Sequence, residues 1–207
     1  MESIQMGEDA VLEIHHHAVT CTKEQFDEMW THCPTKKHTF MMRGKLCTMQ
    51  RFQQMYGVES YAFSRIKLEP DPNIPELVQR CIDFANANDP DHEYNGALCN
   101  FYFDSKDYIG EHSDDEDDML PGAPIFSFSF QFGPVRNFRI RNKATKVYRD
   151  FACDHEICLV MSGTRFQKDF THQVPIIAKS KGPRINVTVR AMRKKTTTKK
   201  MCMSDDV

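Results

Sequence analysis

The apolar positions have helical spacing in one early part of the chain and strand spacing later. Residues 24–32 place Phe26, Met29 and Trp30 at i, i+3 and i+4, the pattern of a helix with one buried face. A second helix is predicted over residues 75–87, where Leu, Cys, Ile and Phe fall broadly on one side. We therefore expect two helices near the start of the chain.

From residue 97 onward, short runs rich in Phe, Val and Ile alternate with glycine- and proline-containing breaks, which indicates β-structure. In the segment FSFSFQF, strict alternation places Phe126, Phe128, Phe130 and Phe132 on one face, as in a half-buried strand over a sheet-on-sheet core. The predicted strands are residues 97–103, 123–132, 136–142, 146–152, 156–161, 170–177 and 184–190.

Two further extended runs, residues 38–42 and 45–49, flank Arg43-Gly44 and predict a hairpin with glycine at its tip. Residues 60–68 are predicted to form one more strand. The fold class is thus α+β and mainly β: a β-sandwich or jelly roll with two helices packed on it, in one domain.

We assign the domain to residues 23–192, after a lead-in at 1–22 that contains a solvated His15–His17 run. A polar tail at 193–207, basic and then acidic, is expected to be disordered. Within the domain, residues 36–68 form the hairpin region and residues 97–190 the β-core.

Composition narrows the class of protein. The chain has 207 residues, 40% of them hydrophobic, and a formal net charge of −2, so bulk charge does not mark it as a polyanion binder. Eight cysteines without a C-x-x-C pair, and no signal-peptide pattern, favour free thiols in an intracellular protein of the nucleus or cytoplasm. No apolar run approaches the roughly 20 residues of a membrane span.

The candidate chemistry centres on His112 and Asp114, which lie on one side of an extended segment because residues i and i+2 share a face. His172 lies on a predicted strand later in the chain. Two imidazoles and one carboxylate on one side of a metal make the facial triad of non-haem Fe(II) oxygenases.

Alone, an H-x-D pattern is more often a solvated surface turn, in a chain with 9 His and 29 acidic residues. Residues 91–93 and 154–156 carry the same types of side chain and are ranked as surface. A Ca²⁺-binding module is a further alternative for the acidic run, but Gly110 precedes the acids, against the EF-hand spacing.

The pattern of the last predicted strand favours a functional site over a solvated surface turn. In PRINVTVR, Arg184 and Arg190 share one face with Asn186 and Thr188, opposite an apolar face. Guanidinium groups bind carboxylates through two parallel hydrogen bonds, so a dicarboxylate ligand fits this face. A salt-bridged edge strand is the simpler alternative, and it is less natural for four polar residues in register.

Together, N-x-Y at 100–102, H-x-D at 112–114, His172 and R-x-N-x-T-x-R at 184–190 resemble the AlkB family of Fe(II)/2-oxoglutarate dioxygenases. The likeness covers roughly residues 40–190 and is closest to the DNA-repair branch, in which IGEHxDDE and PGxPI also follow one another. It implies a double-stranded β-helix (jelly roll) with a nucleotide-recognition hairpin.

The resemblance also implies roles for individual residues. His112, Asp114 and His172 would hold Fe(II), and O₂ and 2-oxoglutarate would be co-substrates. Arg184 and Tyr102 would bind the distal carboxylate of 2-oxoglutarate. The remaining pocket residues would be Asn100 and Arg190 near the metal, with Asn186 and Thr188 along the wall.

For the substrate, the resemblance implies alkylated bases of the 1-methyladenine and 3-methylcytosine type, demethylated with release of formaldehyde. Asp115 and Glu116 would face the cationic flipped base, which Tyr61 and Phe63 would sandwich against His112. Asp117 and Asp118 are expected to face solvent.

The hairpin tip, Met42-Arg43-Gly44, lacks the aromatic wedge of the duplex-DNA branch, so double-stranded DNA, single-stranded DNA and RNA stay open. For phosphate contact we nominate Arg43, Lys45, Arg51 and the basic segment 193–200. We expect a monomer without membrane contact. The alternative function keeps the iron and 2-oxoglutarate but changes the substrate to a protein or small molecule.

Overall fold

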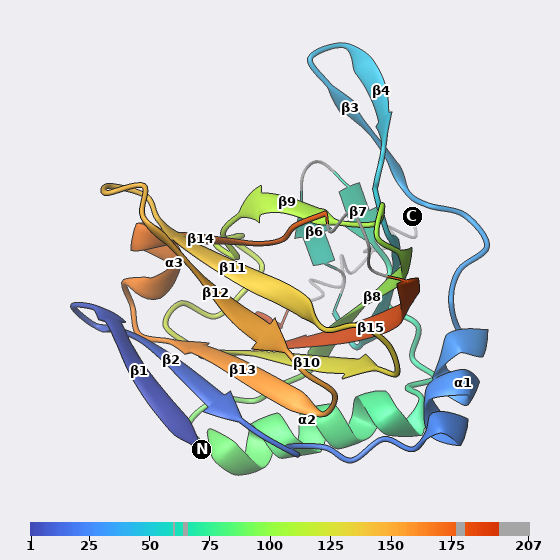
Figure 1. Cartoon of the computed structure of the whole chain (residues 1–207), viewed down its shortest axis with the longest axis horizontal. Helices are drawn as coiled ribbons and strands as arrows, with labels where there is room; N and C mark the ends of the chain where they lie inside the picture. Colours follow the sequence, from blue (N-terminus) through green and yellow to red (C-terminus); the bar gives the residue numbers. More distant parts are fainter. Residues whose placement is uncertain (60, 64–65, 177–180, 195–207) are drawn as a thin grey trace, which may run out of the picture.

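The computed structural model describes residues 1–59, 61–63, 66–176 and 181–194, although the side chains of 42, 61–63, 66 and 181 are not described. The protein is mainly β, with two larger antiparallel sheets and helices beneath the larger sheet (Figure 1). The larger sheet has the order β1 (Glu2–Gly7), β2 (Ala10–His15), β13 (Ile157–Ser162), β10 (Ile125–Gln131), β15 (Lys181–Arg190), β8 (Gly96–Asp104), β5 (Phe52–Gly57). The smaller sheet has the order β12 (Tyr148–Cys153), β11 (Arg136–Asn142), β14 (Phe170–Val174), β9 (Ile109–His112).

Strand β10 lies between two apolar clusters, one on the helix side of the larger sheet and one between the two sheets. Its phenylalanines do share one face, but that face packs on the helices rather than on the other sheet, which corrects the sequence interpretation. The ring of Phe84, from helix α2 (Glu76–Asn88), makes edge-to-face contacts with Phe126 and Phe128 at centroid distances of 6.4 and 5.6 Å. Phe132 lies just beyond the strand and is 44% exposed. The interior face of β10 therefore carries the alternate, polar side chains.

The two longer helices cover the outer face of the larger sheet (Figure 1). Helix α1 (Lys23–Thr31) begins with a complete capping box between Thr22 and Gln25, and it buries Phe26 and Met29. Helix α2 follows Pro75 as its N-cap and buries one side against β15 and β8. No helix among the described residues combines the length and apolar character needed to cross a bilayer.

The first 15 residues are not a lead-in. They form β1 and β2, and β2 pairs with β13 in the larger sheet. Ala10, Leu12 and Ile14 are buried on alternate positions of β2. This period-2 pattern is visible in the sequence AVLEIH, so the expected lead-in is corrected to two strands.

A ribbon of two strands, β3 (Thr39–Met42) and β4 (Lys45–Thr48), projects away from the body of the protein (Figure 1). Its tip has φ of 48° at Arg43 and 76° at Gly44. Positive φ at both central residues is typical of a type I′ turn, which explains the glycine and confirms the predicted hairpin. Segment 60–68 is two short strands instead of one, β6 (Tyr61–Phe63) paired with β7 (Ile66–Leu68).

Candidate active site

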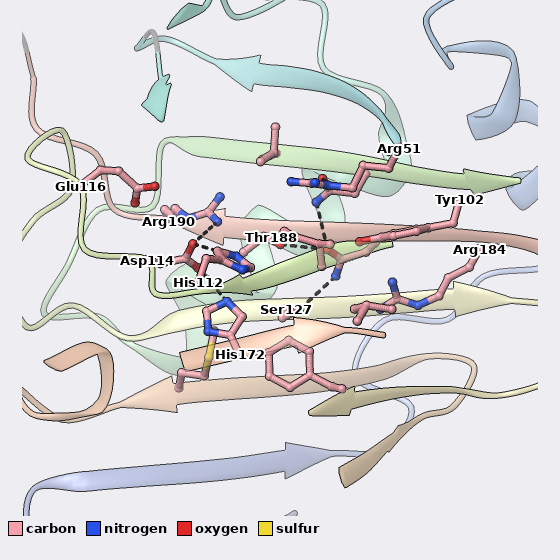
Figure 2. A pocket seen from close by; sticks show the side chains of 17 residues that line it. Arg51, Tyr102, His112, Asp114, Glu116, Ser127, His172, Arg184, Thr188 and Arg190 are labelled. Carbon is pink, nitrogen blue, oxygen red and sulfur yellow. Dashed lines mark hydrogen bonds and ion pairs between the residues drawn. The ribbon is translucent and has the colours of Figure 1, made fainter. Parts of the chain in front are cut away.

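Three side chains predicted to bind metal converge between the two sheets. His112 ends β9, His172 lies directly opposite it on β14, and Asp114 follows two residues after His112. One ligand atom from each lies within 4.8 Å of the other two, and no other such group occurs in the described parts of the chain. Figure 2 shows the three side chains pointing toward one another. The structure therefore brings together residues that are 60 positions apart, as the sequence predicts.

Both imidazoles are prepared to act as neutral ligands. The Nδ1–H of His112 can donate to the carbonyl of Gly110 at 2.8 Å, which leaves the Nε2 lone pair, 3.7 Å from Asp114 Oδ1, for a metal. The ring of His172 stacks on Phe138 at 5.1 Å. Burial, and then the neighbouring His112, lower the pKa of His172 to about 3, so this ring is neutral near pH 7.

The carboxylate of Asp114 is buried but stays ionised. Burial raises its pKa, yet the positive charge of Arg190 together with the two imidazoles lowers it well below the usual range. Arg190 Nη2 donates to Asp114 Oδ1 at 3.0 Å. The other oxygen, Oδ2, has no hydrogen-bond partner among the described residues. A buried anionic oxygen without a donor is well suited to a cation, because burial of such an atom is otherwise costly.

From this cluster a polar cavity runs along the inner face of the larger sheet. Asn186 on β15 is its central residue: its amide donates to Ser127 Oγ at 3.0 Å and to the carbonyl of Phe128 at 2.8 Å. Its oxygen accepts from Thr188 at 3.0 Å and from Asn100 at 3.2 Å. Asn100, Asn186 and Thr188 therefore line one wall, as predicted, and support one another by hydrogen bonds.

Arg184 and Tyr102 lie at the end of the cavity away from the histidines (Figure 2). The guanidinium of Arg184 lies over the ring of Tyr102, with Cζ 5.1 Å from the ring centroid. Its Nε donates to Ser129 Oγ at 2.9 Å, while its Nη1 is buried and has no hydrogen-bond partner within the described chain. A fixed guanidinium with a spare donor at a closed end suits a carboxylate.

Sequence reasoning missed the polar half of β10 and one buried arginine. Ser127, Ser129 and Gln131 are all nearly buried and share the strand face that Arg184 and Asn186 also contact. Their signal lies in the sequence itself, since every second residue of FSFSFQF is polar. Arg136 at the start of β11 is 1% exposed, and the arginine-rich run RNFRIRN contains nothing that singles it out.

The resemblance implied that Asp115 and Glu116 face the substrate and that Asp117 and Asp118 face solvent, and the structure agrees with this only in part. Glu116 lines the metal cavity, whereas Asp115 is exposed and lines a neighbouring cavity of about 410 Å³ instead. Asp117 is exposed, and Asp118 is partly buried, with its carbonyl accepting from Arg193 N–H at 2.8 Å. Glu116 is therefore the acid of this run beside the metal cluster.

Two predicted surface assignments change. Arg51, nominated for phosphate contact, is 5% exposed inside the cavity, and its Nε donates to Asn100 Oδ1 at 2.6 Å. Within 154–156, Glu156 is only partly exposed: it accepts from Cys21 N–H at 2.7 Å and pairs with His17 Nδ1 at 2.8 Å. It ties the segment after β2 to the sheet. Both residues were misjudged because polarity alone does not predict exposure.

The other nominated substrate residues lie on or near the projecting hairpin. Arg43 and Lys45 are exposed at its tip beside Gly44. The side chains of Met42, Tyr61 and Phe63 are outside the described residues, so their predicted roles stay predictions. Of the basic segment 193–200, only the first two residues are described, and Lys194 pairs with Glu93 at 2.7 Å.

Comparison with known families now adds to this geometry. The model of the "2OG-Fe(II) oxygenase superfamily" matches residues 12–190, which include every residue of the cavity described above. The chain belongs to this superfamily. The match begins within β2 and ends with β15, so it includes most of β2 but not β1.

Among proteins similar to this oxygenase, "Alpha-ketoglutarate-dependent dioxygenase alkB homolog 3" of Mus musculus is 36% identical over 69% of the chain and 51% of its own length. The human protein of that name is 33% identical over 77% of the chain and 57% of its own length. The chain thus spans about half the length of these relatives.

"DNA oxidative demethylase ALKBH2" of Mus musculus is 33% identical over 81% of the chain and 71% of its own length. The chain therefore belongs to the AlkB family. A solved structure of OsALKBH1 superposes with a TM-score of 0.59 at 17% identity, covering 91% of this chain and 99% of that one, and supports the fold alone.

The residues present fit the cofactors of this superfamily. The two neutral imidazoles and the ionised carboxylate of Asp114 are the ligand set of a ferrous facial triad. Asp114 Oδ2 and Arg184 Nη1, which have no hydrogen-bond partner within the described chain, lie at opposite ends of one cavity. A metal would be bound at the Asp114 end and a carboxylate at the Arg184 end. Iron(II), 2-oxoglutarate and O₂ are the cofactor and co-substrates of the family.

Proposed function

We propose that this chain oxidatively demethylates N-alkylated bases in nucleic acid, with His112, Asp114 and His172 holding Fe(II) and Arg184 with Tyr102 holding the distal carboxylate of 2-oxoglutarate. The observation that carries the proposal is one cavity with a neutral-imidazole and carboxylate cluster at one end and a buried arginine at the other. Relatives named for demethylation of DNA support the substrate class.

We further propose that the two facing sheets form a double-stranded β-helix, and that β3–β4 is a nucleotide-recognition hairpin. The extension of β3–β4 from the body and the exposed Arg43 and Lys45 at its tip support a phosphate contact. We assign the domain to residues 1–192, because β1 and β2 are part of the larger sheet. A monomer in the nucleus or cytoplasm is consistent with this function.

Bound iron and 2-oxoglutarate would supply the oxidising chemistry that, with O₂, hydroxylates the N-methyl group and yields succinate and CO₂. The chain's own residues organise this chemistry. Neutral His112 and His172 offer lone pairs, and Arg190 holds Asp114 ionised. Asn186 fixes the wall between the two ends through its four hydrogen bonds.

The acidic side of the site selects the substrate. Adenine methylated at N1, or cytosine methylated at N3, carries positive charge, and Glu116 lies beside the metal cluster. A carboxylate there favours a cationic base over a neutral one. After hydroxylation, the C–N bond of the hemiaminal breaks: its electron pair returns to the ring nitrogen, the hydroxyl proton leaves, and formaldehyde is released.

The test is a demethylation assay with Fe(II), 2-oxoglutarate and matched oligonucleotides carrying 1-methyladenine or 3-methylcytosine in single- and double-stranded DNA and in RNA. We expect stoichiometric formaldehyde and unmodified base from at least one form, and none from unmethylated controls. Turnover of 2-oxoglutarate that ignores every oligonucleotide would instead favour the protein or small-molecule substrate. Tight Ca²⁺ binding without iron-dependent turnover would contradict an oxygenase role altogether.

A further inference from the structure

A second buried arginine lies behind the closed end of the cavity. Arg136, the first residue of β11, is 1% exposed and does not line the cavity itself. Its guanidinium carbon lies 5.3 Å from the centroid of the Tyr102 ring, and that of Arg184 lies 5.1 Å from the same centroid. Two guanidinium groups thus share one aromatic ring at the position proposed for the distal carboxylate.

Arg136 is held by main-chain oxygens rather than by acids. Its Nη1 donates to the carbonyl of Asp104 at 3.2 Å, and its Nη2 donates to those of Asp107 and Pro175 at 2.7 and 2.9 Å. The carboxylate of Asp107 is engaged elsewhere, with Lys37 Nζ at 2.5 Å and Phe103 N–H at 2.7 Å. Within the described residues no carboxylate is hydrogen-bonded to Arg136, and the nearby Asp107 raises the pKa of Arg136 only as a smaller opposing effect.

The two arginines therefore place like charges in a buried region. Burial, and after it the charge of Arg184, lower the pKa of Arg136, which is the direction expected when a second cation lies close by. Two buried N–H donors in this region have no hydrogen-bond acceptor within the described chain: Arg184 Nη1 and Arg136 Nε. Asp107 offsets this buried positive charge only in part, and incompletely compensated buried charge is costly, so this end of the cavity is matched to an anion.

We propose that Arg136 is a specificity-determining positioning residue: through Tyr102 and Arg184 it adds a second positive charge that selects co-substrates with a carboxylate at the end distal to the 2-oxo acid. The proposal rests on the proposed function of this cavity as a 2-oxoglutarate site. Arg136 acts without touching the ligand, because its field reaches the carboxylate across a low-dielectric, water-poor region.

A purely structural role is the alternative, since the same guanidinium ties together the end of β8, the turn after it and the segment after β14. The two roles differ in what they do to different ligands. A structural role affects every 2-oxo acid alike. An electrostatic role affects only those that carry the distal carboxylate.

The experiment measures calorimetric dissociation constants, on Mn²⁺-loaded protein, for 2-oxoglutarate and for 2-oxopentanoate, which keeps the 2-oxo acid and replaces the distal carboxylate with methyl. Arg136→Gln should weaken 2-oxoglutarate roughly 10-fold and leave 2-oxopentanoate unchanged. Arg136→Lys, which keeps the charge, should stay within about threefold of wild type for both ligands. The Mn²⁺ affinity of each variant reports whether the metal end is intact.

Equal weakening of both ligands, or unchanged 2-oxoglutarate binding in Arg136→Gln, would overturn the inference and leave the co-substrate site standing. The inference is also overturned if Arg136→Lys weakens 2-oxoglutarate about 10-fold or more, and this criterion decides the question even if Arg136→Gln fails to fold. Failure of the proposed function looks different: wild-type protein would bind 2-oxoglutarate no better than 2-oxopentanoate, and both proposals would then fall together.

Discussion

The two ends of the cavity are built differently. The metal end comes from the smaller sheet and a loop, with His112 at the close of β9, Asp114 beyond it and His172 on β14. The other end comes from central strands of the larger sheet, with Tyr102 on β8 and Arg184 on β15, both buried. His112 keeps 30% of its side chain exposed. The metal end is thus open on one side, as the proposed base substrate would require, whereas the arginine end is buried.

Charge separates the ends as well. At the metal end the carboxylate of Asp114 is paired with Arg190, and the carboxylate of Glu116 lies nearby, so this end offers negative charge to a divalent cation. At the other end two arginines are buried near one tyrosine. We infer that metal affinity depends on the first end and co-substrate selectivity on the second, and each can be perturbed alone.

The largest effect is expected from His112→Ala. Because loss of an outer partner of a metal ligand alone typically costs 10–100-fold, loss of the ligand itself should cost at least about 100-fold in metal affinity and abolish demethylation. Calorimetry with Mn²⁺ in the absence of 2-oxoglutarate checks this directly. Asp118→Ala, in the acidic run that follows His112, should change neither metal affinity nor demethylation by more than about twofold. Equal losses in the two variants would disprove the assignment of Asp118 to a position outside the metal site.

Arg184→Gln should produce the reverse pattern. Removal of a charge-assisted, two-point contact costs about 2–3 kcal/mol, which is roughly 30- to 150-fold in 2-oxoglutarate affinity. Mn²⁺ affinity without 2-oxoglutarate should stay at the wild-type value, because Arg184 lies at the far end of the cavity. Arg149→Gln, an exposed arginine on β12, is the matched control. A parallel loss of Mn²⁺ binding in Arg184→Gln would show that the two ends are not separable.

A smaller loss is expected from Gln167→Met, which removes a support of the metal end. The Oε1 of Gln167, in the short helix α3 (Phe166–Asp169), accepts from the N–H of Asp114 at 2.9 Å and so links the two segments that carry the ligands. We expect Mn²⁺ affinity to fall roughly 10-fold. Gln167→Glu keeps the acceptor and should retain most of the affinity. If the two variants behave alike, the hydrogen bond does not position Asp114.

The sequence predicted those features that follow from the residue pattern within a single strand, and it did not predict those that depend on contacts with distant segments. The R-x-N-x-T-x-R face and the pairing of His112 with Asp114 were predictable because alternation along an extended segment fixes which side chains share a face, whereas alternation does not fix the position of His172 on another strand. The orientation of β10 was not, because its phenylalanines could pack on a sheet or on helices, and only the position of α2 decides. Arg51 and Arg136 were missed for a related reason: burial of an arginine depends on carbonyls and amides contributed by distant segments. The early strands β1 and β2 were readable from period-2 alternation and were overlooked.

The last prediction concerns how the stability of the metal-free protein depends on pH. His172 has a pKa of about 3 in the folded protein and about 6.5 when unfolded, because burial disfavours its charged form. Between these values the unfolded chain binds one proton more than the native state. The contribution of His172 to the free energy of unfolding is therefore fully present above about pH 6.5 and falls as the pH drops toward 3. His172→Gln should remove this contribution, so that the difference in denaturation midpoint between it and wild type changes steadily from pH 7 to pH 4. Carboxylates elsewhere titrate in both proteins and cancel in that difference. A difference that stays constant over this range would mean that the metal end is more solvated than its burial indicates, and the contrast with the closed arginine end would weaken accordingly.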